Sequence, residues 1–121
     1  MMTENKEILI VDDDPNTART LVDILSIKGF NALKSSTPEE TLALIAKKEP
    51  YCVISDIRMP GMNGIELFDI LQEKHPQIPI ILMSAYTVED LLSERVNQGV
   101  VAVLSKPLDI DLLLMFLNAL E

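Results

Sequence analysis

The chain has 121 residues, of which 48% are hydrophobic and 24% are charged, as expected of a packed protein with a single domain over residues 1–121. Lys and Arg total 10 against 19 Asp and Glu, and the net charge of −9 argues against nucleic-acid binding by this chain alone. Its apolar runs are too short to cross a membrane, and residues 1–7 lack the apolar stretch of a signal peptide, so we expect a cytoplasmic protein.

Cysteine and histidine, the residues that most often mark redox or zinc chemistry, occur once each. Cys52 lies in an apolar run, where we expect a small buried hydrophobic side chain, because one thiol can form neither an internal disulfide nor a zinc site. His75 lies in a polar stretch and is interpreted as part of a solvated helix end rather than as a ligand or a base.

Strands and helices are predicted to alternate from the start of the chain. Residues 7–11 (EILIV) form a short apolar run that ends in three aspartates, as a buried strand would. Asp14 is interpreted as the cap of a following helix, Pro15 suits its first turn, and Gly29 is expected to end it. Residues 30–34 are a weaker candidate for the second strand.

The second helix has a recognisable beginning. Residues 37–40 (TPEE) combine the pattern of a capping box with proline at the first helical position. Leu42, Ile45 and Ala46 are expected to form its buried face, and Pro50 follows its end.

The second half of the chain continues the alternation. Residues 51–55 (YCVIS) are a third apolar run, and the next helix is expected to turn Phe68 and Leu71 inward. The remaining elements are a strand at 78–83, a helix marked by Leu92 and Val96, a strand at 100–104 and a last helix whose buried face is Ile110, Leu113, Leu114 and Leu117.

The predicted strands are apolar throughout rather than at every second position. That pattern indicates strands buried on both faces, which is typical of a parallel sheet covered by helices on each side. Right-handed crossovers then predict an α/β fold of three layers, a doubly wound five-stranded parallel sheet of the (βα)5 type with a flavodoxin-like strand order. In such sheets ligands bind beyond the carboxyl ends of the strands.

Polar side chains follow four of the predicted strands. Asp12 and Asp13 come after the first strand, Asp56 after the third, Ser84 after the fourth and Lys106 after the fifth. Each alone could be an ordinary cap or turn residue, but together they would gather at one edge of the sheet. Three carboxylates there would repel one another and favour a bound cation, and hard oxygen ligands without thiol or imidazole suit Mg²⁺.

Four motifs together resemble the response regulator receiver domain (CheY-like) of two-component signalling. They are ILIVDDD at residues 8–14, SDIRMPGMNG at 55–64, MSA at 83–85 and SKP at 105–107. The match covers nearly the whole chain, in the order and at the spacing of the family.

The resemblance implies roles for the matched residues at the site of phosphorylation. Asp56 would be the phosphoacceptor, Ser84 the switch hydroxyl that moves toward the phosphoryl group, and Lys106 the cation that pairs with it. The peptide bond before Pro107 would be cis. The phosphoryl group would come from a phosphohistidine of a sensor histidine kinase or phosphotransfer protein, in a phosphorelay.

The resemblance also implies a magnesium site and a switching function. Asp13, Asp56 and the backbone carbonyl of Arg58 would bind Mg²⁺, with Asp12 acting through water. Phosphorylation would change the affinity of the domain for a partner or for a second copy. The domain would assist its own phosphotransfer and autodephosphorylation but would not be an enzyme with a separate substrate.

Three positions depart from the pattern of the family. An aromatic residue usually stands where this chain has Val103, so we expect the signal to pass through the backbone of the loop after Ser84 and the fourth helix instead of through ring rotation. Arg58 and Tyr86 are long side chains at positions that flank the path of the hydrolytic water in the family, and we expect slow decay of the phosphoryl group.

The last helix is apolar on nearly every side. Leu112, Met115 and Ala119 lie opposite its buried face, on the surface shared by the fourth helix, the fifth strand and the last helix. Such an apolar stripe suggests a homodimer or an adjacent output domain. The other explanation is that a continuation of the chain covers it.

Two other functions compete with that of a receiver domain. A phosphatase of the haloacid dehalogenase type would need Thr or Val where this chain has Asn16, and would need a cap domain. The alternative that stays open is a pseudo-receiver, an interaction module of the same fold that is not phosphorylated. The presence of all five matched polar residues argues against it, and Val103 alone favours it.

Overall fold

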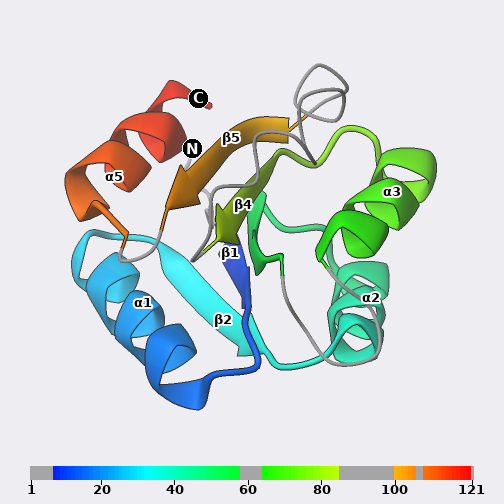
Figure 1. Cartoon of the computed structure of the whole chain (residues 1–121), viewed down its shortest axis with the longest axis horizontal. Coiled ribbons are helices and arrows are strands. Elements are labelled where there is room, and N and C mark those ends of the chain that lie inside the picture. The colour runs from blue at the N-terminus through cyan, green and yellow to red at the C-terminus, as the bar shows by residue number, and fades with distance from the viewer. Residues whose placement is uncertain (1–6, 58–63, 85–99, 106–107, 121) are drawn as a thin grey trace.

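A computed structural model of the chain describes residues 7–57, 64–84, 100–105 and 108–120. Five parallel strands form one sheet in the order β2-β1-β3-β4-β5, with α1 and α5 on one face and α2 and α3 on the other (Figure 1). This confirms the predicted doubly wound, flavodoxin-like sheet of three layers. The strands are β1 (Glu7–Val11), β2 (Asn31–Ser35), β3 (Cys52–Asp56), β4 (Ile80–Ser84) and β5 (Val100–Ser105), and the helices are α1 (Pro15–Ile27), α2 (Pro38–Lys47), α3 (Gly64–Lys74) and α5 (Ile110–Ala119).

The core has two halves because the central strands are apolar on both faces. Alternate residues of β1, β3 and β4 pack against α1 and α5: they are Ile8, Ile10, Cys52, Ile54, Ile81 and Met83. The residues between them pack against α2 and α3: they are Leu9, Val11, Val53, Ile80 and Leu82. Each fully buried aliphatic side chain contributes about 1.5–3 kcal/mol, so both faces hold the sheet in place.

The end of α1 explains why β2 begins one residue later than predicted. Gly29 has a φ of 98°, and its N–H donates to the Ser26 carbonyl at 3.1 Å. The Phe30 N–H reaches back to the Leu25 carbonyl at 3.0 Å, which completes a Schellman motif. Phe30 and Leu25 also pack together in the core, so Phe30 belongs to the helix end and the strand starts at Asn31.

The start of α2 is capped as predicted, but its buried face differs from the prediction. Thr37 Oγ1 accepts a hydrogen bond from the Glu40 N–H at 3.1 Å, and the Glu40 carboxylate accepts one from the Ser36 N–H at 3.0 Å. Thr41 is fully buried on this helix, whereas Ala46 is exposed. The prediction for Ala46 was therefore wrong, because Thr41 turns inward to a polar partner that hydropathy does not anticipate.

The single cysteine and the single histidine lie where they were expected. Cys52 is fully buried in β3, and burial raises the pKa of its thiol to about 12. His75 follows the last turn of α3, and its Nδ1 lies 2.9 Å from Glu49 Oε2. Hydrogen bonds from Gln77 and His75 lower the pKa of the Glu49 carboxyl below its usual value.

The outer surface of α5 agrees in part with the prediction. Met115 is 58% exposed and Ala119 is exposed, while Leu112 is half-buried against the core. The predicted helix around Leu92 and Val96 lies outside the described residues. Within the described parts of the chain, no helix is long and apolar enough to span a lipid bilayer.

The two sides of α5 provide a test of the packing. Leu117 is fully buried, so Leu117→Ala is expected to lower the free energy of unfolding by about 2–5 kcal/mol. Met115→Ala on the same helix is expected to change it by less than about 0.5 kcal/mol. Urea denaturation followed by circular dichroism measures both, and equal losses would contradict the burial of the Leu117 side.

Candidate functional site

Two neighbouring parallel strands bring acidic residues to one edge of the sheet. β1 pairs with β3 in the register Val11 to Ser55, so the residue after β1, Asp12, lies beside the last residue of β3, Asp56. β3 pairs with β4 in the register Asp56 to Met83, and Ser84 ends β4 at the same edge. We call this the carboxyl edge of the sheet.

Three carboxylates meet at the carboxyl edge and form what we call the acidic cluster. Asp12, Asp13 and Asp56 each offer one oxygen, and these oxygens all lie within 4.8 Å of one another. Asp12 is 1% exposed and Asp56 is 8% exposed, whereas Asp13 faces solvent. Two of the three carboxylates thus lie largely out of water, where repulsion between them is screened least.

The chain after β1 is folded so that its three aspartates have different surroundings. The Asp14 N–H donates to Asp12 Oδ1 at 2.9 Å, the hydrogen bond of an Asx turn directly after β1. Asp14 itself caps α1, accepting from the Asn16 N–H at 3.0 Å and from Thr17 Oγ1 at 3.1 Å. Asp14 therefore has the structural role predicted for it, and Asp13 is left pointing to solvent.

A polar pair under Asp12 was not singled out by sequence reasoning. The Asp12 N–H donates to the Ser35 carbonyl at 3.1 Å, and Ser35 Oγ lies 2.6 Å from Thr41 Oγ1. Thr41 Oγ1 in turn donates to the Thr37 carbonyl at 2.8 Å. Ser35 and Thr41 are both buried, so this chain of hydrogen bonds ties the end of β2 and the start of α2 to Asp12. The only signal in the sequence was a serine at the end of a predicted strand. This signal was weak, because β2 (NALKS) has few apolar residues and was itself a weak strand prediction.

A surface hollow lies beside the acidic cluster. Asp12 and Asp13 line it together with residues of α1, β2 and α2, namely Pro15, Ala18, Lys34, Ser35, Ser36 and Glu40. Lys34 places a cation in the wall of this hollow, opposite in sign to the acidic cluster.

Four residues named in the predictions for the site lie outside the described residues: Arg58, Tyr86, Lys106 and Pro107. Val103 is described, and it is half-buried against the half of the core that α2 and α3 cover. The structure thus brings Asp12, Asp13, Asp56 and Ser84 to one edge and places the residue at the usual aromatic position within the packing.

The donor set of the acidic cluster suits a hard divalent cation. Carboxylate oxygens are the ligands that Mg²⁺ and Ca²⁺ prefer, and the soft or imidazole ligands of the chain, Cys52 and His75, belong to the core of the sheet and to the end of α3. The three oxygens are close enough for one ion to contact more than one of them. The residues present therefore fit a bound Mg²⁺.

Comparison with known proteins points to one family. The family model of the response regulator receiver domain matches residues 8–118. The DNA-binding transcriptional regulator NtrC of Salmonella typhimurium is 36% identical over 104 residues, which are 86% of this chain but 22% of that protein. The chain thus spans about a fifth of the length of such relatives.

Two further similarities extend over most of both proteins. Sporulation initiation phosphotransferase F of Bacillus subtilis is 31% identical over 107 residues, covering 88% of this chain and 86% of that protein. The response regulator protein TrrA of Thermotoga maritima, in complex with Mg²⁺ and BeF, superposes with a TM-score of 0.85 at 29% identity, covering 96% of this chain and 99% of that one.

Removing one charge from the acidic cluster tests the repulsion within it. Without divalent cations and at low ionic strength, Asp13→Asn is expected to raise the free energy of unfolding, because it removes one of three charges that repel one another. The gain is expected to be at most about 1 kcal/mol, since water screens the exposed Asp13. Asp23→Asn makes the same charge change at an exposed position of α1 and is expected to have no comparable effect. Urea denaturation measures both, and an equal gain in the two variants would attribute the effect to net charge.

Proposed function

Because the chain belongs to the family of response regulator receiver domains, we propose that it is a phosphorylation-dependent switch in which Asp56 accepts a phosphoryl group. We further propose that residues 1–121 act as one receiver unit. The observation that carries the proposal is the acidic cluster at the carboxyl edge, where Asp12, Asp13 and Asp56 place carboxylate oxygens within 4.8 Å of one another.

Asp56 is the proposed acceptor because of its position among the three carboxylates. It ends β3, which has a strand on each side, and it is the member of the acidic cluster that lies at the end of a central strand rather than in the loop after one. An oxygen of Asp56 would attack the phosphorus of a phosphohistidine in line with the bond to nitrogen. The new O–P bond makes an acyl phosphate, the P–N bond breaks, and the imidazole leaves with the bonding electron pair and takes up a proton.

A magnesium ion is proposed as the cofactor. Asp13, Asp56 and the backbone carbonyl of Arg58 would hold it, with Asp12 acting through water. When bound, Mg²⁺ would neutralise charge on the carboxylates and on the transferred phosphoryl oxygens. The burial of Asp12 and Asp56 supports this assignment, because repulsion between nearly buried carboxylates is poorly screened and a bound cation would reduce it.

Two further side chains would respond to the phosphoryl group. Ser84 ends β4 at the carboxyl edge, and its hydroxyl would donate a hydrogen bond to the phosphoryl group. Lys106 would pair with the same group as a point charge. Val103 is half-buried within the packing, which supports a signal carried by the backbone after Ser84 rather than by the swing of a ring.

The phosphodonor, a sensor histidine kinase or phosphotransfer protein, would dock in a groove that starts at the carboxyl edge. One wall is a side of α1 that runs from Asn16 to Ile24, and the other is formed by Leu108 and Ile110. α1 follows the acidic cluster directly, and the segment before Leu108 follows the end of β5, whose Ser105 pairs with Ser84. A helix seated in this groove would therefore bring a histidine close to Asp56.

A second surface would transmit the signal. The outward side of α5, with Leu112, Met115 and Ala119, would contact a second copy of the chain or an output domain. The exposure of Met115 and Ala119 supports this assignment.

Phosphorylation can be tested directly by intact mass. After incubation with acetyl phosphate and Mg²⁺, the parent is expected to gain the mass of one phosphoryl group, and chelation of the metal is expected to prevent the gain. Asp56→Asn, checked for folding by circular dichroism, is expected to gain none. A folded parent that gains nothing from acetyl phosphate or from a histidine kinase would instead favour the non-phosphorylated interaction module.

The docking groove can be tested separately from the chemistry. Ile24→Glu is expected to slow phosphotransfer about tenfold from a histidine kinase that phosphorylates the parent, because it places a charge in the groove. Phosphorylation by acetyl phosphate should be unchanged. Ile27→Glu, at a residue of the same helix that is 81% exposed and outside the groove, is the control, and an equal effect in both variants would contradict the assignment.

A further inference from the structure

The outer edge of β2 carries backbone groups that no strand in the described sheet pairs with. β2 is the end strand of the sheet, and its ladder partner is β1. The Ser35 carbonyl accepts from the Asp12 N–H, so the backbone of Ser35 faces β1. Because backbone groups point to opposite sides at successive residues of a strand, the N–H and C=O groups of Ala32 and Lys34 face outward. Such an edge is a template for another strand.

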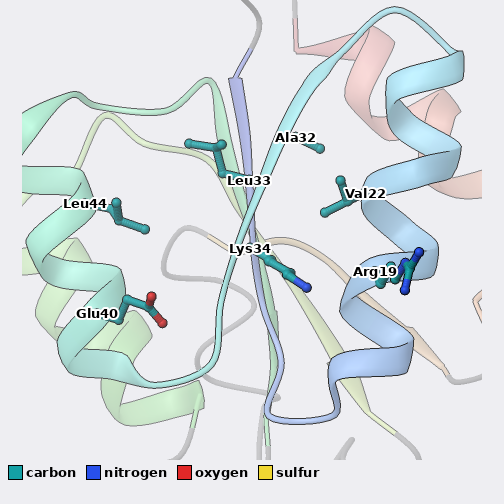
Figure 2. A pocket seen from close by; sticks show the side chains of 7 residues that line it. All are labelled: Arg19, Val22, Ala32, Leu33, Lys34, Glu40 and Leu44. Atoms are coloured by element: carbon teal, nitrogen blue, oxygen red, sulfur yellow. The ribbon is translucent and has the colours of Figure 1, made fainter.

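A groove runs along this edge between α1 and α2, and we call it the edge groove (Figure 2). On the α2 side Leu33 points toward Leu44, and on the α1 side Ala32 points toward Val22 (Figure 2). Leu33 is 40% exposed, and Leu33 and Leu44 also line a second hollow farther along the same edge. An added strand would thus find an apolar strip on its α2 side.

The α1 side of the edge groove is positively charged. Arg19 and Lys34 both line it, and Lys34 extends from β2 toward α1 (Figure 2). Neither has an ion-pair partner within the described parts of the chain. Glu40, across the groove on α2, accepts a hydrogen bond from the Ser36 N–H and so stays at the start of its helix. A protein of net charge −9 therefore presents two cations together beside an open strand edge.

The charges distinguish between possible occupants. Two copies of the chain paired edge to edge would bring the Arg19 and Lys34 side chains of both copies into one region, where like charges repel. A strand with acidic side chains on one face and apolar side chains on the other would match both sides of the edge groove, since side chains alternate between the faces of a strand. The acidic face would meet Arg19 and Lys34, and the apolar face would meet Leu33 and Leu44.

We propose that the edge groove binds an extended acidic segment of a partner protein, which adds to β2 as a further strand. Main-chain hydrogen bonds to Ala32 and Lys34 would supply affinity, and the alternating side chains would supply selectivity. The binding does not involve the acidic cluster, so it is separate from phosphorylation of Asp56.

Nuclear magnetic resonance of the full chain tests this proposal with a synthetic probe. Acetyl-Val-Glu-Val-Glu-Val-Glu-amide is titrated into isotope-labelled protein. We expect shifts at Ala32 and Lys34 and slower exchange of both amide protons. The same peptide with Lys in place of Glu, and an N-methylated peptide that lacks its donors, are each expected to bind at least about tenfold more weakly.

Charge variants of the protein complete the test. Arg19→Glu is expected to weaken binding of the acidic peptide about tenfold, while Lys28→Glu, the same charge change beyond the end of α1, is expected to have little effect. Asp56→Asn is expected to bind the peptide as the parent does, which separates this test from that of phosphorylation. Unchanged Ala32 and Lys34 signals, or equal binding of all three peptides, would overturn the proposal. Concentration-dependent protection of the same amides without peptide would also overturn it, since the occupant would then be a second copy.

Discussion

The parallel pairing of β1 with β3 is the constraint on which the rest of the structure depends. Its register sets Asp12 beside Asp56 at the carboxyl edge, and both strands are held there by packing on their two faces. Nearly buried carboxylates so close together repel one another, and a bound cation would reduce that repulsion. The apolar residues of β1 and β3, which pack on both faces of the sheet, supply stability that offsets this repulsion.

The acidic cluster and the edge groove are neighbours on the surface. Lys34 and Glu40 line both the hollow beside Asp12 and Asp13 and the groove along β2. Ser35 lies between them, with its carbonyl bonded to the Asp12 N–H and its hydroxyl bonded to Thr41. The proposed phosphorylation and the proposed strand addition would therefore use separate atoms but take place on adjoining parts of the surface, which share Lys34 and Glu40.

Much of the fold could be predicted, because it depends on patterns within short stretches of the sequence. Strands apolar on both faces predicted a parallel sheet, and polar residues at their ends predicted the carboxyl edge, where Asp12, Asp13, Asp56 and Ser84 do lie. The burial of Thr41 was not predictable, because it depends on the Ser35 hydroxyl, six residues away and on another element. The start of β2 was misplaced because Phe30 is used to close α1, and only the backbone of the Schellman motif reveals that. The hydropathy of the sequence reveals neither the contact between Thr41 and Ser35 nor the role of Phe30 at the end of α1.

Tyr51 has a consequence for spectroscopy of this protein. The chain contains no tryptophan and two tyrosines, Tyr51 and Tyr86, so its ultraviolet emission comes from phenols. The Tyr51 hydroxyl donates to the Leu117 carbonyl at 3.0 Å and so joins the start of β3 to α5 across 66 residues of sequence. A displacement of α5 from the sheet would break that bond and change the quantum yield of Tyr51. The part of the intrinsic fluorescence that comes from Tyr51 therefore reports whether α5 is packed against the sheet.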